Sequence, residues 1–207
     1  MYHRLRRVPL APAAFAFATA AVSPASAASP VVTFGFDDAA LQFRNAADFV
    51  EPGLSASPWS DSDGTLTNLA GNPGKALGAK SFHDGNTLRF TLTVAPDYAL
   101  YLGGFSFDAQ VSASGPKIWT LSLAGDALAS GATATSFQTN AGSFAEQRFI
   151  GAVDVAIRGE AATSASGTFR LDNFALAGRI AAVPLPAAAW LAAVPGALVL
   201  RRRRPAR

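Results

Sequence analysis

Residues 87–94 read Thr-Leu-Arg-Phe-Thr-Leu-Thr-Val, and apolar and polar side chains alternate over all eight positions. Successive side chains of a β-strand point to opposite faces, so this period of two predicts a half-buried strand. Four side chains are expected to face a core: Leu88, Phe90, Leu92 and Val94. The opposite face, Thr-Arg-Thr-Thr, is expected to meet water, as in antiparallel sheets that cover one side of a core.

Further short runs of strand-forming residues lie on both sides of this segment. They are Val31–Phe36, Ala76–Phe82, Ala99–Ala109, Lys117–Leu123, Arg148–Arg158 and Gly167–Ala177. Turn-forming residues such as Asp84-Gly85-Asn86 and Gly115-Pro116 separate them. Seven or more short strands with turns between them predict one all-β domain over residues 28–182, an antiparallel β-sandwich, with a closed barrel as the alternative architecture. Only Asp38–Val50 shows a loose helical spacing of apolar residues.

The last predicted strand contains an irregularity. In residues 168–176, Thr-Phe-Arg-Leu-Asp-Asn-Phe-Ala-Leu, the apolar residues change from odd to even positions across Asp172 and Asn173. One extra residue, a β-bulge, would return both sets to the same face. We therefore expect a bulge at this point.

The first 27 residues have the three parts of a secretory signal. A positively charged start precedes an uncharged, mostly apolar run at Leu10–Val22, which is too short to span a bilayer. Ala25 and Ala27 form the small-x-small pattern that signal peptidase accepts, so cleavage is expected after Ala27.

The last 25 residues, 183–207, form a second apolar segment with a basic end. Its order is Val183, Pro184, Leu185, Pro186 and Ala187, then the uncharged run Ala188–Leu200, then Arg201, Arg202, Arg203 and Arg204. As a helix, residues 183–200 would span about 27 Å at ~1.5 Å per residue, close to a hydrocarbon core of about 30 Å. The arginines are expected on the cytoplasmic side.

This tail resembles the VPLPA variant of the PEP-CTERM sorting signal of bacteria. The resemblance implies recognition by an exosortase-type membrane enzyme, cleavage near the Pro-Leu-Pro segment, and release or transfer to the cell surface. We therefore expect an exported protein that is membrane-anchored as a precursor and then lies at the cell surface or outside the cell.

The charge of the predicted domain differs in sign from that of the whole chain, whose net charge is +3. Eight of the 17 Lys and Arg residues lie in the two ends, which leaves 9 basic against 14 acidic side chains between them, a net charge of −5. Such a domain repels phosphate, so nucleic acid is excluded as a partner. The chain contains no cysteine, which excludes thiol catalysis and cysteine-based metal sites.

Catalytic motifs were not found between the two ends. A Ser-His-Asp triad needs a histidine, and residues 28–182 contain only His83, in a turn-forming stretch. No G-x-S-x-G elbow is present, and no pair of acidic residues forms a motif for glycoside hydrolysis. We therefore predict a cell-surface or extracellular-matrix protein with a noncatalytic β-sandwich and no cofactor, with a secreted hydrolase as a more distant alternative.

Aromatic side chains suggest an alternative function, a carbohydrate-binding module that acts on exopolysaccharide. The candidates for stacking on a sugar are Trp59, Tyr98, Tyr101 and Trp119. Trp119 shares its parity with Leu121, which favours the core, whereas Trp59 lies in a Pro-, Ser- and Asp-rich stretch and is predicted to be exposed. Trp59 is therefore the predicted ligand-binding residue.

The end of the domain, residues 167–174, also resembles the final strand of the jelly-roll domains of PEP-CTERM proteins and carbohydrate-binding modules. In such domains the first and last strands are neighbours, and aspartates near each end commonly bind a structural calcium ion. The resemblance implies ligands at Asp37, Asp38 and Asp172, because Asp172 lies at the expected bulge and calcium prefers oxygen ligands. The alternative is that these aspartates face solvent or end strands.

Overall fold

Thirteen β-strands form within residues 29–37 and 44–183, the part of the chain that the computed structural model describes. Their bounds are β1 Pro30–Phe34, β2 Phe49–Val50, β3 Leu54–Ala56, β4 Ser60–Asp61, β5 Leu66–Ala70, β6 Lys75–Lys80, β7 Thr87–Val94, β8 Tyr98–Val111, β9 Ile118–Leu123, β10 Asp126–Ala132, β11 Gln138–Phe149, β12 Ala152–Glu160 and β13 Thr168–Ala182. No helix within these residues is long and apolar enough to span a membrane.

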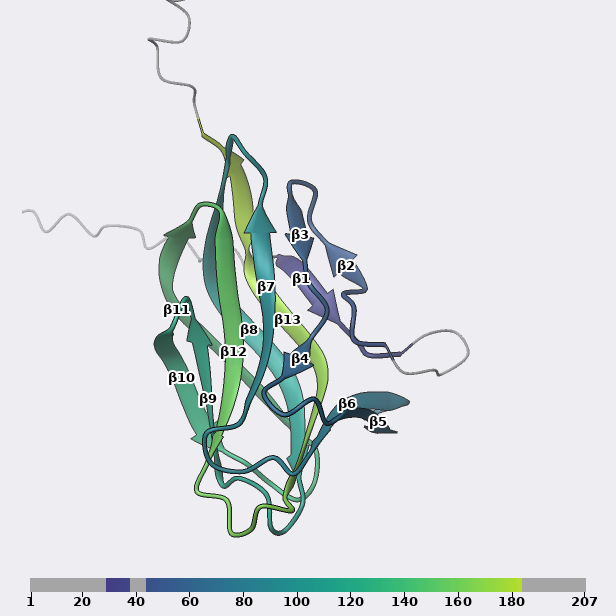
Figure 1. Cartoon of the computed structure of the whole chain (residues 1–207). Helices are drawn as coiled ribbons and strands as arrows, with labels where there is room; N and C mark the ends of the chain where they lie inside the picture. The colour runs from purple at the N-terminus through teal and green to yellow at the C-terminus, as the bar shows by residue number, and fades with distance from the viewer. Residues whose placement is uncertain (1–28, 38–43, 184–207) are drawn as a thin grey trace, which may run out of the picture.

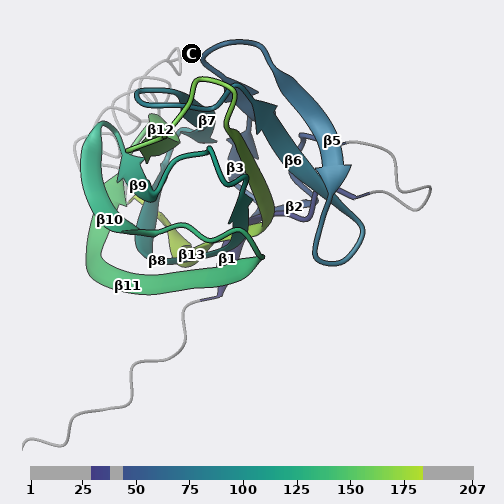
Figure 2. The same ribbon diagram turned by 90° about the horizontal axis from the view of Figure 1, so that it is seen from below.

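The strands form two antiparallel sheets that face each other (Figures 1 and 2). Sheet A has the order β11-β8-β13-β1-β2, and β6, which carries β5, pairs with the beginning of β13. Sheet B has the order β10-β9-β12-β7-β3, and β4 also pairs with β7. The predicted antiparallel β-sandwich is thus confirmed.

The core lies between the sheets and is rich in aromatic side chains. Trp59 is only 1% exposed and packs on Phe90 and Phe174, with ring centroids 4.7 and 5.0 Å apart. Phe34 of β1 contacts Phe90 of β7 at 4.8 Å, so the cluster joins sheet A to sheet B. The four apolar residues of β7 are all buried, as the alternation of residues 87–94 predicts.

The predicted bulge in the last strand is present. The pairing of β13 with β8 skips between Asp172 and Ala175, and Asn173 has a left-handed φ of 49°. Phe169, Leu171, Phe174 and Leu176 are consequently all fully buried. At this bulge β13 changes its neighbour on one side from β6 to β1.

Two segments differ from the strands expected from the sequence. Residues 148–158 are divided between β11 and β12 by a turn at Ile150-Gly151, where Gly151 has a φ of 75°. Residues 44–50 form no helix, and Phe49–Val50 is instead a short strand beside β1, because its backbone pairs with Val32 and Thr33.

Candidate functional site

The outer face of sheet A over β11, β8 and β13 carries outward polar side chains and two open pockets. Phe105 and Phe107 of β8 point inward and contact Trp119, so the alternate residues Ser106, Asp108 and Gln110 point outward. We call this surface the sheet A face. From Tyr101 to Gln110 it extends about 30 Å at ~3.3 Å per residue.

The middle of the sheet A face has a floor of small residues. A pocket of about 380 Å³ lies there, lined by Pro30, Gly103, Gly104, Phe105, Ser106, Gly142, Ser143, Ala175 and Ala177. Ala175 and Ala177 alternate with the buried Phe174 and Leu176, so they present only methyl groups to the outside. A flat ligand can therefore approach the sheet closely at this point.

One end of the sheet A face carries Tyr101. The Arg179 guanidinium lies 3.9 Å from the centroid of its ring, a cation–π arrangement. Arg179 also donates to both carboxylate oxygens of Glu146, at 2.8 and 3.2 Å. Arg148 pairs with Tyr101 across the strands and is exposed.

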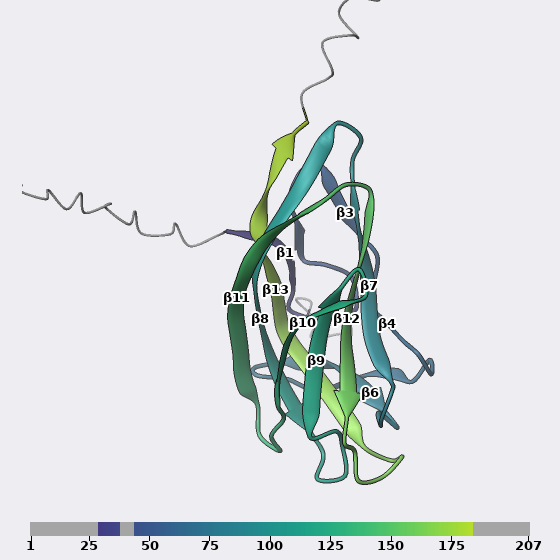
Figure 3. The same ribbon diagram turned by 90° about the vertical axis from the view of Figure 1, so that its left-hand side faces the viewer.

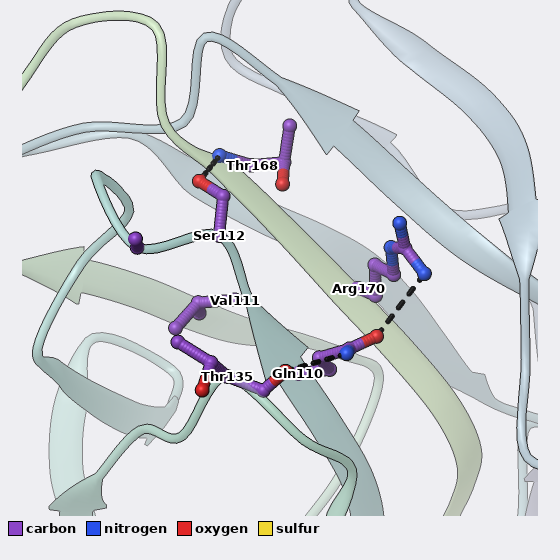
Figure 4. A pocket seen from close by; sticks show the side chains of 7 residues that line it. Gln110, Val111, Ser112, Thr135, Thr168 and Arg170 are labelled. Atoms are coloured by element: carbon purple, nitrogen blue, oxygen red, sulfur yellow. Dashed lines mark hydrogen bonds between the residues drawn. The ribbon is translucent and has the colours of Figure 1, made fainter.

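The other end of the sheet A face is a polar pocket of about 430 Å³ between β8 and β13 (Figure 4). Arg170 donates to the side-chain oxygen of Gln110 at 3.1 Å, and the Gln110 amide donates to the Thr135 carbonyl at 2.6 Å. The Ser112 hydroxyl accepts the Thr168 amide at 3.0 Å. No acidic side chain of the described residues forms an ion pair with Arg170, so its guanidinium retains donors for a ligand.

Two carboxylates face each other between these ends, Asp108 on β8 and Asp172 on β13. They are only 8% and 1% exposed. Asp108 accepts from the Thr139 hydroxyl at 2.6 Å and from the Asn173 amide at 2.9 Å. Asp172 is buried and Asp108 nearly so, and therefore this pair does not present two accessible carboxylates to a glycosidic bond.

Asp172 meets Asp37 at the bulge, where the β5–β6 turn folds over them. The Asn72 amide donates to Asp172 at 2.6 Å, and the Lys75 amide donates to Asp37 at 2.6 Å. A Cβ atom at Gly74 would lie 2.1 Å from Asp37 Oδ2, so this turn requires glycine there. The first and last strands are neighbours, and they bring two of the three predicted calcium ligands to one junction.

Burial raises the pKa of Asp172 from 3.8 to about 6. Hydrogen bonds from the Asn72 and Asn173 amides oppose this increase, whereas the negative charges of Asp37 and Asp108 add to it. Within residues 29–37 and 44–183, none of the ion pairs includes these three aspartates. The junction therefore holds excess negative charge.

This pKa predicts the pH dependence of stability in the presence of a chelator. Because folded Asp172 binds its proton more tightly than unfolded Asp172, it stabilises the fold at low pH, and this contribution is lost as pH rises through about 6. Between pH 7 and 5 its contribution should increase by about 1 kcal/mol. Urea titrations of the wild type and of Asp172→Asn at pH 7 and pH 5 isolate this contribution. The same change in the free energy of unfolding between these pH values in both proteins would contradict it.

The described residues contain no group of three or more His, Cys, Asp or Glu side chains that converges on a possible metal position. Asp38, the third predicted ligand, lies outside the described residues. Calcium at this junction would therefore need Asp38, backbone oxygens or water in addition to Asp37 and Asp172.

The prediction that Trp59 binds a ligand is wrong, because its side chain is in the core. Its backbone lies outside any strand, but Asn45 holds it on both sides: Trp59 N donates to Asn45 O at 2.8 Å, and Asn45 Nδ2 donates to Trp59 O at 3.0 Å. Trp119 is buried, as predicted, whereas Tyr98 is 39% exposed and Tyr101 is half-buried.

The predicted signal and sorting segments lie almost entirely outside the described residues. This holds for Ala25 and Ala27, for Pro184 to Ala187 and for Arg201 to Arg204. Only Val183 is described, directly after β13.

Neither a protein-family model nor a curated protein matches the sequence. Among solved structures, the CBM22 tandem domain of Paenibacillus barcinonensis Xyn10C is 13% identical, with a TM-score of 0.44 over 80% of this chain and 50% of that chain. This chain thus spans half the length of that structure.

Two further similarities are with single carbohydrate-binding modules. The family 11 module from Clostridium thermocellum is 13% identical, with a TM-score of 0.40 over 76% of this chain and 100% of that chain. The mannan-recognising module TmCBM27 is 10% identical, with a TM-score of 0.42 over 73% and 99%. These similarities concern the β-sandwich architecture and do not assign a ligand to this chain.

Proposed function

We propose that this β-sandwich is a noncatalytic glycan-binding module of an exported protein, with exopolysaccharide as its ligand. The observation that carries the proposal is the sheet A face. It combines a floor of small residues with hydrogen-bonding side chains at both ends. A glycan is an extended chain of hydroxyl groups, and Gln110, Arg170 and Ser112 offer donors and acceptors for them.

Tyr101 would contribute an apolar ring at the other end of the same surface. Arg179 covers the ring and would either move or contact the sugar itself, since its guanidinium has five N–H donors. The inaccessibility of Asp108 and Asp172 supports binding without cleavage.

Delivery outside the cell is part of the proposal. The support is the sequence alone: the small-x-small site at Ala25 and Ala27, and the arrangement of motif, apolar run and arginines in residues 183–207. Signal peptidase, an exosortase-type enzyme and, before processing, the membrane would then be partners of the chain.

Arg170→Ala tests the glycan site. Losing hydrogen bonds from a charged group costs about 1.5–3 kcal/mol, so binding should weaken by roughly 10- to 100-fold. The measurement is affinity electrophoresis of the full chain in gels that contain exopolysaccharide from the producing cells.

The matched control is Arg89→Ala, which removes an exposed arginine from β7 on the outer face of sheet B. It should leave binding unchanged. Equal loss in both variants, or no binding by the wild type, would contradict the proposed site.

We further propose a structural calcium ion at the junction of β1, β13 and the β5–β6 turn, with Asp37, Asp38 and Asp172 as ligands. The supporting observation is a buried carboxylate that faces two other carboxylates and has no basic partner among the described residues. A divalent cation would compensate this charge, and it would link Asp172 at the bulge of β13 to Asp37 after the end of β1.

A further inference from the structure

Two of the four exposed large apolar side chains of the described residues lie at the same end of the sandwich; the other two are Phe49 on β2 and Ile118 at the start of β9. Ile150, in the β11–β12 turn, is 61% exposed, and Tyr98, at the start of β8, is 39% exposed. Single exposed apolar residues are ordinary. Their position is informative because β13, the last described strand, ends beside the β7–β8 turn at this same end (Figures 1 and 3).

Backbone hydrogen bonds hold this end together. Val183 donates to Asp97 O at 2.6 Å, Ala95 donates to Gly53 O at 2.8 Å, and Val94 donates to Gly151 O at 2.9 Å. The β2–β3, β7–β8 and β11–β12 turns and the end of β13 thus form one surface, which we call the exit end.

The turns of the exit end, residues 51–53, 95–97 and 150–151, contain two charged residues, Glu51 and Asp97. The turns at the opposite end also contain charged residues, such as Lys117. Charge therefore does not distinguish the two ends; the C-terminal tail that follows the exit end does.

The length of the connection to the C-terminal tail restricts where the exit end can lie. Only residues 184–187 separate Val183 from the uncharged run that begins at Ala188. Four extended residues reach at most about 14 Å. If the uncharged run enters a bilayer, the exit end must lie within that distance of the lipid surface.

We propose that the exit end is a membrane-contacting surface of the anchored precursor, with Ile150 and Tyr98 in the lipid interface. The proposal rests on the membrane anchoring in the proposed function. Tyrosine favours the interface because its ring is apolar and its hydroxyl can reach water, and Ile150 removes apolar surface from water there. The Gln110–Arg170 pocket then lies at the far end of the sheet A face, away from the membrane.

The test uses the full chain reconstituted in phospholipid nanodiscs. Because the chain has no cysteine, Ile150→Cys can be labelled at one position with an environment-sensitive fluorophore. The matched control is Ala165→Cys, an exposed residue in the turn at the opposite end. We expect a blue-shifted emission at position 150 that quencher-labelled lipid reduces at least twofold, and no quenching at position 165.

Three results would overturn the proposal, and they are distinguishable. If the chain does not enter nanodiscs, the anchoring itself is wrong. If it enters but position 150 emits as in water, anchoring stands and the membrane contact is wrong. If position 150 is blue-shifted but lipid quenchers have no effect, protein rather than lipid covers the exit end.

Discussion

Trp59→Ala is expected to destabilise the fold by about 3–5 kcal/mol, the cost of removing a large aromatic side chain from a packed core. Trp59 is fully enclosed, and its ring contacts Phe34, Phe90 and Phe174 at centroid distances of 5.6, 4.7 and 5.0 Å. The measurement is the free energy of unfolding from urea titration. A loss of this size is a large fraction of the stability of a typical domain.

Trp59→Phe is the matched variant. The indole Nε1 has no hydrogen-bond partner among the described residues, so phenylalanine loses no hydrogen bond there and leaves a smaller cavity than alanine. It should cost clearly less than the alanine variant. If Trp59→Ala left stability unchanged and weakened glycan binding instead, Trp59 would be a ligand-binding residue after all.

Calcium is expected to give the second large effect. At pH 7.5, calcium at 100 times its dissociation constant should stabilise the chelator-treated full chain by about 2.7 kcal/mol. For a domain of this size that corresponds to an increase in melting temperature of roughly 5–10 °C. At pH 5 the increase should shrink, because protonation of Asp172 competes with the cation.

Asp172→Asn should abolish the calcium-dependent increase in melting temperature. Asp154→Asn is its control, because Asp154 lies on the outer face of sheet B, where it accepts from the Thr91 hydroxyl at 2.7 Å. A melting temperature that is the same in chelator and in millimolar calcium would contradict the site.

Strands with regular alternation could be predicted from the sequence. The bounds of β7 coincide with the predicted residues 87–94, and the bulge at Asp172 and Asn173 follows from the change of parity between Leu171 and Phe174. In both cases one face of the strand is buried by the other sheet, so the residue types must follow the pleat.

β11 could not be predicted from its pattern, because its inward positions are not uniformly apolar. Asn140 points inward and accepts the Trp119 indole N–H at 3.0 Å, and Gly142 lies where a Cβ would come within 2.8 Å of the Phe105 ring. Neighbouring aromatic side chains fill the space that residues on β11 would otherwise occupy.

The candidate site was only partly predictable, because part of it depends on which residues the strand register places opposite each other. The jelly-roll resemblance indicated Asp37 after the first strand and Asp172 at the expected bulge, but Asp108 resembles any other polar residue of an alternating strand. It joins them only because its register sets it opposite Asp172. Trp59 was misplaced because polar neighbours in the sequence do not show that its ring turns inward between the sheets.

The position of β13 in sheet A has a consequence for the order of events during synthesis and during the export that we propose. β13 lies between β8 on one side and both β6 and β1 on the other, so strands from the beginning and middle of the chain join only through it. Sheet A therefore cannot be completed until residue 182 has been synthesised. Because these contacts are distant in sequence, the domain is expected to fold late and slowly. Because sheet A stays incomplete until its last strand emerges, the domain can cross a membrane in unfolded form and complete its folding on the far side.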